Sequence, residues 1–112
     1  MARKTAFIYD DVLSRHSLSE THPMKPVRLR YTYELLRAYG AFNAPNAQLV
    51  KPRQATEEEI LSFHTDEYVR AVQAFNTGNA PVDAIRFNFG PGDNPGYAGI
   101  YDAASWSTGG AI

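Results

Sequence analysis

Apolar positions predict a strand, a long helix and a second strand in the first fifty residues. The run 5–9 (TAFIY) is apolar without alternation, which is typical of a strand buried on both faces. Pro26 suits the first turn of a helix, and Gly40 suits its end. Between them an apolar residue recurs every fourth position, which predicts one apolar face: Val27, Tyr31, Leu35 and Tyr39. Residues 48–50 are a candidate second strand.

The second half of the chain predicts three further helices. Thr56 and Glu59 have the spacing of a capping box. Thr65 is a candidate cap for the next helix, in which Tyr68, Val72 and Phe75 share a face at helical spacing. A last helix is expected to begin near residue 97. The loop 78–96 before it is rich in Gly, Pro and Asn, and loops of this length are often binding loops.

About two strands and four helices are the elements of an α/β layer. Two strands do not form an independent sheet, so we expect the sheet to be incomplete in this chain. The apolar faces then need a partner, either further residues of a longer chain or another copy. Residues 107–112 carry no charge. We therefore expect residues 1–112 to be a single partial domain.

Charge and composition narrow the class of protein. Eleven Lys and Arg against twelve Asp and Glu give a net charge of −1, which argues against a nucleic-acid partner. The chain has no cysteine, so disulfides and cysteine ligands are excluded. No segment has the length and apolarity of a membrane span or a signal peptide. We expect a cytoplasmic protein with no membrane partner.

Motifs for catalysis or metal binding are missing. His16, His22 and His64 are not at metal-ligand spacing, and there is no HExxH or Asp-x-His pattern. We expect hydrogen-bonded, structural histidines. No serine lies in a GxSxG elbow, and the glycines of 90–96 do not fit a dinucleotide or phosphate loop.

Two segments remain as binding candidates. Asp93, on the Gly- and Pro-rich loop, could accept hydrogen bonds from N–H groups of a ligand, or it could simply turn the chain. The prolines at 23 and 26 make a rigid entry into the first helix, which would hold His22 to Met24 firmly against another part of the protein. Arg28 follows one turn later; if buried it must be paired, and otherwise it is a solvated arginine.

Several of these segments resemble one family in order and spacing. His22–Arg30 resembles the HPMKPxRIR segment of histone deacetylases, and is similar to bacterial acetoin-utilization and acetylpolyamine-deacetylase-like members. Further similarities follow in the order of the family: Leu-Leu-x-x-Tyr-Gly at 35–40, FHTDEYV at 63–69, RFNFG at 86–90 with Asp93-x-Pro95, and STGG at 107–110. The resemblance spans about residues 7–112.

The resemblance implies the amino-terminal part of an arginase/deacetylase-like three-layer α/β fold. Its members are zinc hydrolases that remove acetyl groups from lysine or polyamine nitrogens. Their zinc ligands, paired histidines and transition-state tyrosine would follow later in the chain. We therefore expect no catalytic residue, no metal ligand and no cofactor within these 112 residues, with zinc belonging to the full-length parent.

Three residue roles carry over by resemblance. Asp93 matches the rim aspartate that holds the substrate backbone, and Pro23 matches a position in the pocket wall. Arg28 matches the arginine that guards an internal cavity through which acetate leaves. Lys25 matches an inositol-phosphate-binding position, a role that we do not transfer. One extra residue between Gly90 and Asp93 departs from the pattern of the family.

Two functions follow from the sequence. The first is the amino-terminal fragment of a zinc-dependent deacetylase acting on acetylated lysine or polyamine, inactive by itself. The second is a non-catalytic oligomerisation or interaction module, in which exposed apolar faces form a homo-oligomer.

Overall fold

The computed structural model describes residues 3–79 and 84–112, so residues 80–83 of the predicted loop lie outside the described residues. The described part contains the two strands and four helices that the sequence predicts, and it is a mixed α/β segment with a sheet of two strands. Strands β1 and β2 pair in parallel, with Phe7 opposite Leu49. The elements are β1 (Thr5–Ile8), α1 (Val27–Ala38), β2 (Ala47–Val50), α2 (Glu57–Leu61), α3 (Asp66–Asn76) and α4 (Ile100–Ala111).

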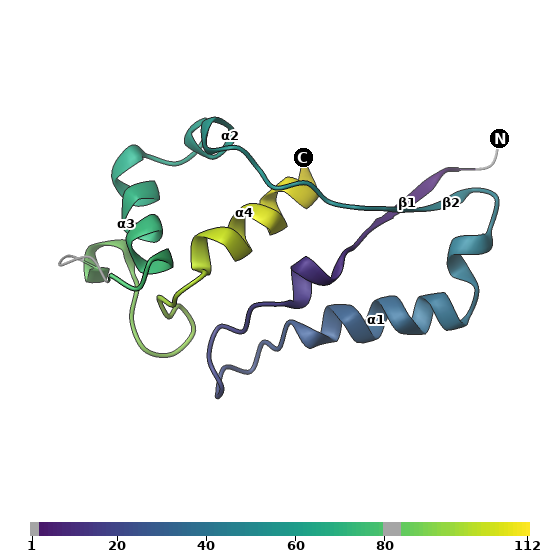
Figure 1. Ribbon diagram of the computed structural model, residues 1–112, viewed down its shortest axis with the longest axis horizontal. Coiled ribbons are helices and arrows are strands. Elements are labelled where there is room, and N and C mark those ends of the chain that lie inside the picture. Colours follow the sequence, from purple (N-terminus) through teal and green to yellow (C-terminus); the bar gives the residue numbers. More distant parts are fainter. Residues whose placement is uncertain (1–2, 80–83) are drawn as a thin grey trace.

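The described elements form an open and elongated body. Figure 1 shows β1, β2 and α1 at one end, α2 and α3 at the other, and α4 between them. The radius of gyration is 16.6 Å, whereas a compact chain of this length would have about 13 Å. The solvent-accessible surface is 8042 Å², against about 6,200 Å² for a folded monomer of this mass. Roughly 1,800 Å² of surface is therefore exposed in excess of a closed domain.

Strand β1 is less buried than the sequence predicts. Thr5, Ala6 and Ile8 are exposed and Phe7 is half-buried, so the prediction of a strand buried on both faces is wrong for this structure. Parallel strands become buried when layers cover both faces. In the described residues β1 has one neighbouring strand, and aromatic contacts cover only part of it.

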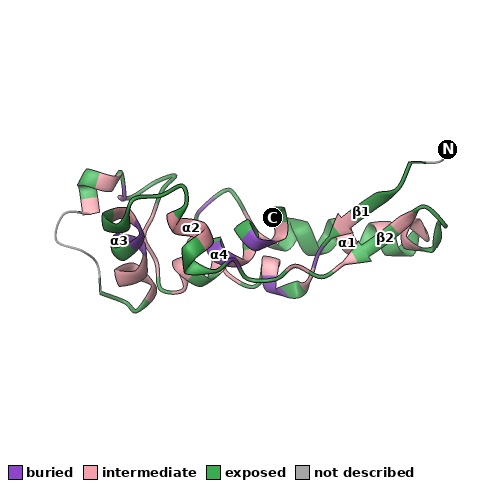
Figure 2. Cartoon of the chain, turned by 90° about the horizontal axis from the view of Figure 1, so that it is seen from above, coloured by how far each residue is buried: buried purple, intermediate pink, exposed green. Residues whose placement is uncertain are grey.

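Helix α1 has two apolar sides, and only one of them is packed. Tyr33 stacks on Tyr9 and on Phe42, with ring centroids 4.7 and 5.7 Å apart. The predicted face lies on another side and is exposed: Val27 is 40% exposed, Tyr31 64%, Leu35 55% and Tyr39 80%. Figure 2 shows that no part of α1 is buried.

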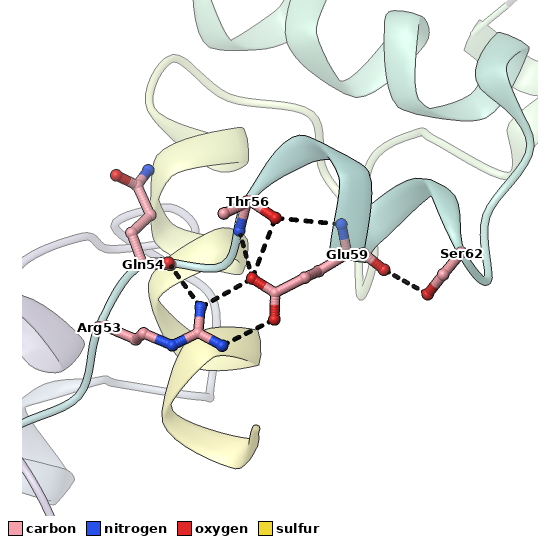
Figure 3. A network of polar contacts seen from close by, with 5 residues as sticks. All are labelled: Arg53, Gln54, Thr56, Glu59 and Ser62. Atoms are coloured by element: carbon pink, nitrogen blue, oxygen red, sulfur yellow. Dashed lines mark hydrogen bonds and ion pairs between the residues drawn. The ribbon is translucent and has the colours of Figure 1, made fainter.

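Helix α2 begins with the predicted capping box, which the structure confirms. The Thr56 hydroxyl accepts from the Glu59 backbone N–H at 3.2 Å, and the Glu59 carboxylate accepts from the Thr56 N–H at 3.0 Å. Arg53 adds a two-pronged ion pair to the same carboxylate, with both N–O distances 2.7 Å (Figure 3). Thr65 caps α3 through its hydroxyl, as predicted.

Helix α4 fixes the segment that links β2 to α2. Ser105 is 1% exposed. Its carbonyl accepts from Ala55 N–H at 2.9 Å, and its hydroxyl accepts from the Gln54 amide at 2.8 Å. One turn later, a Cβ on Gly109 would lie 1.8 Å from the Arg53 carbonyl oxygen. Only glycine allows this close approach between helix and chain.

Among the helices that the structure describes, none combines the length and the apolarity that a membrane crossing requires.

Candidate functional site

Two segments far apart in sequence form one pocket, which we call the rim pocket. It has a volume of about 320 Å³ and is lined by Ser19 and Thr21 to Pro23 on one side and by Pro91 to Asp93 and Pro95 on the other. Both residues that the resemblance assigns to substrate binding, Pro23 and Asp93, therefore lie in the same pocket. Their proximity is an observation, and their roles stay predictions.

The chain before α1 forms one wall of this pocket. Pro23 and Pro26 restrict its backbone, and Pro26 immediately precedes α1 in helical conformation (φ −59°, ψ −21°). Lys25 turns its ammonium group back onto the preceding loop and donates to the carbonyl oxygens of Ser19 and Glu20 at 3.3 and 2.5 Å. The wall is thus tied to its own loop before the helix begins.

His22 connects this wall to the opposite loop. The side chain is buried, with 8% of the residue exposed. Its Nδ1 accepts from the backbone N–H of Met24 at 3.1 Å, and Nε2 lies 3.1 Å from the backbone carbonyl oxygen of Asp93. Since Nδ1 is an acceptor, this network assigns the proton of a neutral ring to Nε2, which donates to Asp93.

The sequence indicated that His22 to Met24 would be held firmly against another part of the protein. The structure shows that His22 contacts the loop at Asp93. The sequence did not indicate the bond to Asp93, because 71 residues separate the two partners. The expectation of a hydrogen-bonded structural histidine is confirmed for His22.

The opposite loop is closed by its own hydrogen bonds. The Asn94 amide donates to the Asn88 carbonyl at 2.8 Å, and the Gly90 N–H donates to the Asn94 carbonyl at 3.0 Å. Phe89, 5% exposed, anchors the loop against Phe75 of α3 with ring centroids 4.8 Å apart. The turn at Gly92 has φ +100°, a conformation that other residues rarely adopt. The loop thus presents residue 93 from a defined backbone.

Asp93 and Pro23 are both exposed at the pocket. A carboxylate at such a position can accept hydrogen bonds from a ligand N–H and can attract a cationic ligand. A proline offers a rigid apolar surface beside it. The pocket therefore suits an amide-bearing or amine-bearing ligand.

Arg28 lies in a different pocket, which we call the Arg28 pocket. Its volume is about 260 Å³, and its lining includes Arg28, His16, Met24 and Tyr97. Arg28 is exposed, so the requirement for a buried partner does not arise. Burial raises the pKa of the Tyr97 hydroxyl, which therefore stays protonated at neutral pH. Residues between 22 and 28 line both pockets, but Arg28 itself does not line the rim pocket.

The resemblance to histone deacetylases implies a zinc ion, and the described residues do not fit one. No group of three His, Cys, Asp or Glu side chains in the described ranges could hold a metal ion. The three histidines occupy separate places: His22 bonds to Asp93, His16 lines the Arg28 pocket, and His64 packs between Phe63 and Tyr68.

Comparisons with known proteins match nearly the whole chain to one family. The histone deacetylase domain profile matches residues 22–112, a match that begins at His22. The chain is 34% identical over 111 residues to the acetoin utilization protein AcuC of Bacillus subtilis, covering 98% of this chain and 28% of that protein. It is 34% identical to type-1 histone deacetylase 1 of Dictyostelium discoideum, with 98% and 22% covered.

A third relative is histone deacetylase RPD3 of Saccharomyces cerevisiae, 33% identical with 98% of this chain and 25% of that protein covered. The chain spans roughly a quarter of the length of these relatives. The domain match covers more than half of the chain, and the alignments to these relatives cover 98% of it. This chain belongs to the histone deacetylase family.

Proposed function

We propose that this chain supplies the substrate-facing wall of a zinc-dependent deacetylase that hydrolyses N-acetyl groups on lysine or polyamine amines. The observation that carries the proposal is the rim pocket, in which Pro23 and Asp93 line one cavity from segments about 70 residues apart. Membership of the family supports this interpretation of the pocket, because by resemblance Asp93 matches its rim aspartate and Pro23 matches a position in its pocket wall.

Each residue has a distinct role in the proposal. The Asp93 carboxylate accepts hydrogen bonds from N–H groups of the substrate, and hydrogen bonds to a charged group are worth about 1.5–3 kcal/mol. Pro23 forms the apolar wall beside it. Arg28 guards the second pocket, through which the released acetate would pass as an anion attracted by the guanidinium group.

Zinc, when bound in such an enzyme, polarises the amide carbonyl and activates water. The described residues form no ligand group for it. In the proposal, the zinc ligands and the catalytic histidines come from other parts of the complete enzyme, and the residues of this chain bind and orient the substrate.

The test is deacetylation of an acetyl-lysine peptide and an acetylpolyamine by the complete enzyme. Asp93→Ala should lower kcat/KM by about tenfold to a hundredfold, as expected for the loss of a charged hydrogen bond. Glu58→Ala removes an exposed carboxylate from α2 and is the matched control. Unchanged kcat/KM for Asp93→Ala, or no deacetylation of either substrate class, would refute the proposal.

A second function is favoured by the exposed face of α1. We propose that this chain, when present by itself, forms a homo-oligomer through the stripe of Val27, Tyr31, Leu35 and Tyr39. Its support is the excess exposed surface of roughly 1,800 Å², since a specific interface needs about 800 Å² from each partner. Light scattering should show a dimer or larger species that Tyr31→Ser with Leu35→Ser converts to a monomer. A monomer for the unaltered chain would exclude this module.

A further inference from the structure

A hydrogen bond between His22 and the Asp93 backbone joins the two walls of the rim pocket. The roles proposed for Pro23 and Asp93 give no function to this bond. His22 is the buried residue among those that line the pocket at residues 21–23 and 91–93, and it contacts the backbone of Asp93 rather than its carboxylate. The Asp93 carboxylate is therefore left available to a ligand. The same histidine joins the two walls through their main chains.

We infer that His22 is a positioning residue that sets the place of Asp93 for substrate binding, an inference that rests on the proposed function. The ring is fixed at both nitrogens, by the Met24 N–H at Nδ1 and by the Asp93 carbonyl at Nε2, each at 3.1 Å. Because both ring nitrogens are hydrogen-bonded, the two bonds together restrict rotation of the imidazole about its bond to Cβ. The Met24 bond orients the ring, and the Asp93 bond transmits that orientation across the pocket.

The need for such a tie follows from the loop itself. Its internal bonds join residue 88 to 94 and 90 to 94, and its anchor, Phe89, lies four residues before Asp93. Residues 91–93 pass through a left-handed turn at Gly92, and glycine restricts its own backbone less than any other residue does. Among the hydrogen bonds of the described residues, the one from His22 to the Asp93 carbonyl joins the outer part of this loop to the opposite wall. Without it, substrate binding would have to order the loop, which costs affinity.

Two substitutions of His22 test its two hydrogen bonds one at a time. Asn places its side-chain oxygen near the position of Nδ1, so His22→Asn keeps an acceptor for Met24 but does not reach Asp93. Gln places an N–H near the position of Nε2, so His22→Gln keeps a donor for Asp93 and loses the Met24 acceptor. A packing or folding role would make the two variants similar, whereas a positioning role makes them differ.

The experiment measures steady-state kinetics and amide hydrogen exchange of residues 90–96 in the complete enzyme. For His22→Asn we expect KM to rise about tenfold, the equivalent of one such hydrogen bond, with kcat changed less than about threefold and faster exchange in the loop. For His22→Gln we expect KM within about twofold of the unaltered enzyme and protected loop amides. His64→Asn, in a histidine that packs between Phe63 and Tyr68, is the matched control.

Equal KM values for the Asn and Gln variants, or a loss confined to kcat, would overturn the inference. So would unchanged loop exchange in His22→Asn. If the unaltered enzyme deacetylates neither substrate class, the proposed function fails. The exchange difference between the two variants then still decides whether His22 holds the loop.

Discussion

Replacing Gly109 with Ala tests the close approach of α4 to the backbone of residues 53–55. The new Cβ would lie 1.8 Å from the Arg53 carbonyl oxygen and 2.6 Å from the Ala55 nitrogen, where ordinary contacts begin at 3.4 Å. Both atoms belong to the backbone, so the clash cannot be relieved by a side-chain rotation. Helix α4 must move away from residues 53–55 by more than an ångström.

The loss in the free energy of unfolding can be estimated from the contacts and hydrogen bonds that this movement of α4 disrupts. Overpacking costs about 1–3 kcal/mol. The bonds of Ser105 to Ala55 and Gln54 contribute about 0.5–1.5 kcal/mol each. The better helix propensity of Ala returns up to about 1 kcal/mol. We expect a net loss of about 2–4 kcal/mol in the free energy of unfolding.

The neighbouring residue supplies the control. A Cβ on Gly110 would lie 3.5 Å from Ile8 and Pro52, which is ordinary contact. Gly110→Ala should therefore be neutral or stabilising by up to about 1 kcal/mol. Urea unfolding followed by far-ultraviolet circular dichroism compares the two variants under identical conditions. If Gly109→Ala were as stable as Gly110→Ala, the packing of α4 on residues 53–55 would be refuted.

Two further predictions concern other contacts. The hydrogen bond from Arg53 and that from the Thr56 N–H lower the pKa of the Glu59 carboxyl from 4.5 to about 2, so its stabilising effect should be complete above pH 4.5 and be lost as pH falls towards 2. The stability difference between Glu59→Gln and the unaltered chain, measured by urea unfolding from about pH 7 to about pH 2, should therefore shrink over that range; a constant difference would contradict the ion pair. Gly96→Ala would place a Cβ 2.2 Å from the Phe75 ring, so we expect a loss of about 1–3 kcal/mol and a change in the near-ultraviolet circular dichroism of the aromatic cluster, and an unchanged spectrum would contradict that contact.

Local signals in the sequence predicted local structure well. The capping box of α2 depends on Thr56 and Glu59, three residues apart, and the Thr65 cap depends on the N–H of Tyr68. Gly40 ends α1 in the left-handed conformation, with φ +73°. These interactions involve neighbours in the chain, so their residue types and spacing suffice to predict them.

Burial and long-range contacts were predicted less well. The apolar run of β1 indicated two covered faces, but coverage depends on elements that the strand itself does not specify. The periodicity of α1 predicted an apolar face, whereas the packed contact comes from Tyr33 on another side of the helix. The resemblance to the family, rather than any pattern in the sequence, indicated Pro23 and Asp93 as residues of one site. No pattern in the sequence indicated the bond from His22 to Asp93.

We propose that these residues form the substrate-facing wall of a deacetylase and not its metal centre. The decisive experiment is a zinc titration of the purified 112-residue chain, followed by calorimetry and by metal analysis after dialysis. Protein zinc sites need three or four converging ligands, and the described residues form no such group. We predict no stoichiometric zinc after dialysis. Tight binding of one zinc ion per chain would place a metal centre within these residues and refute the proposal.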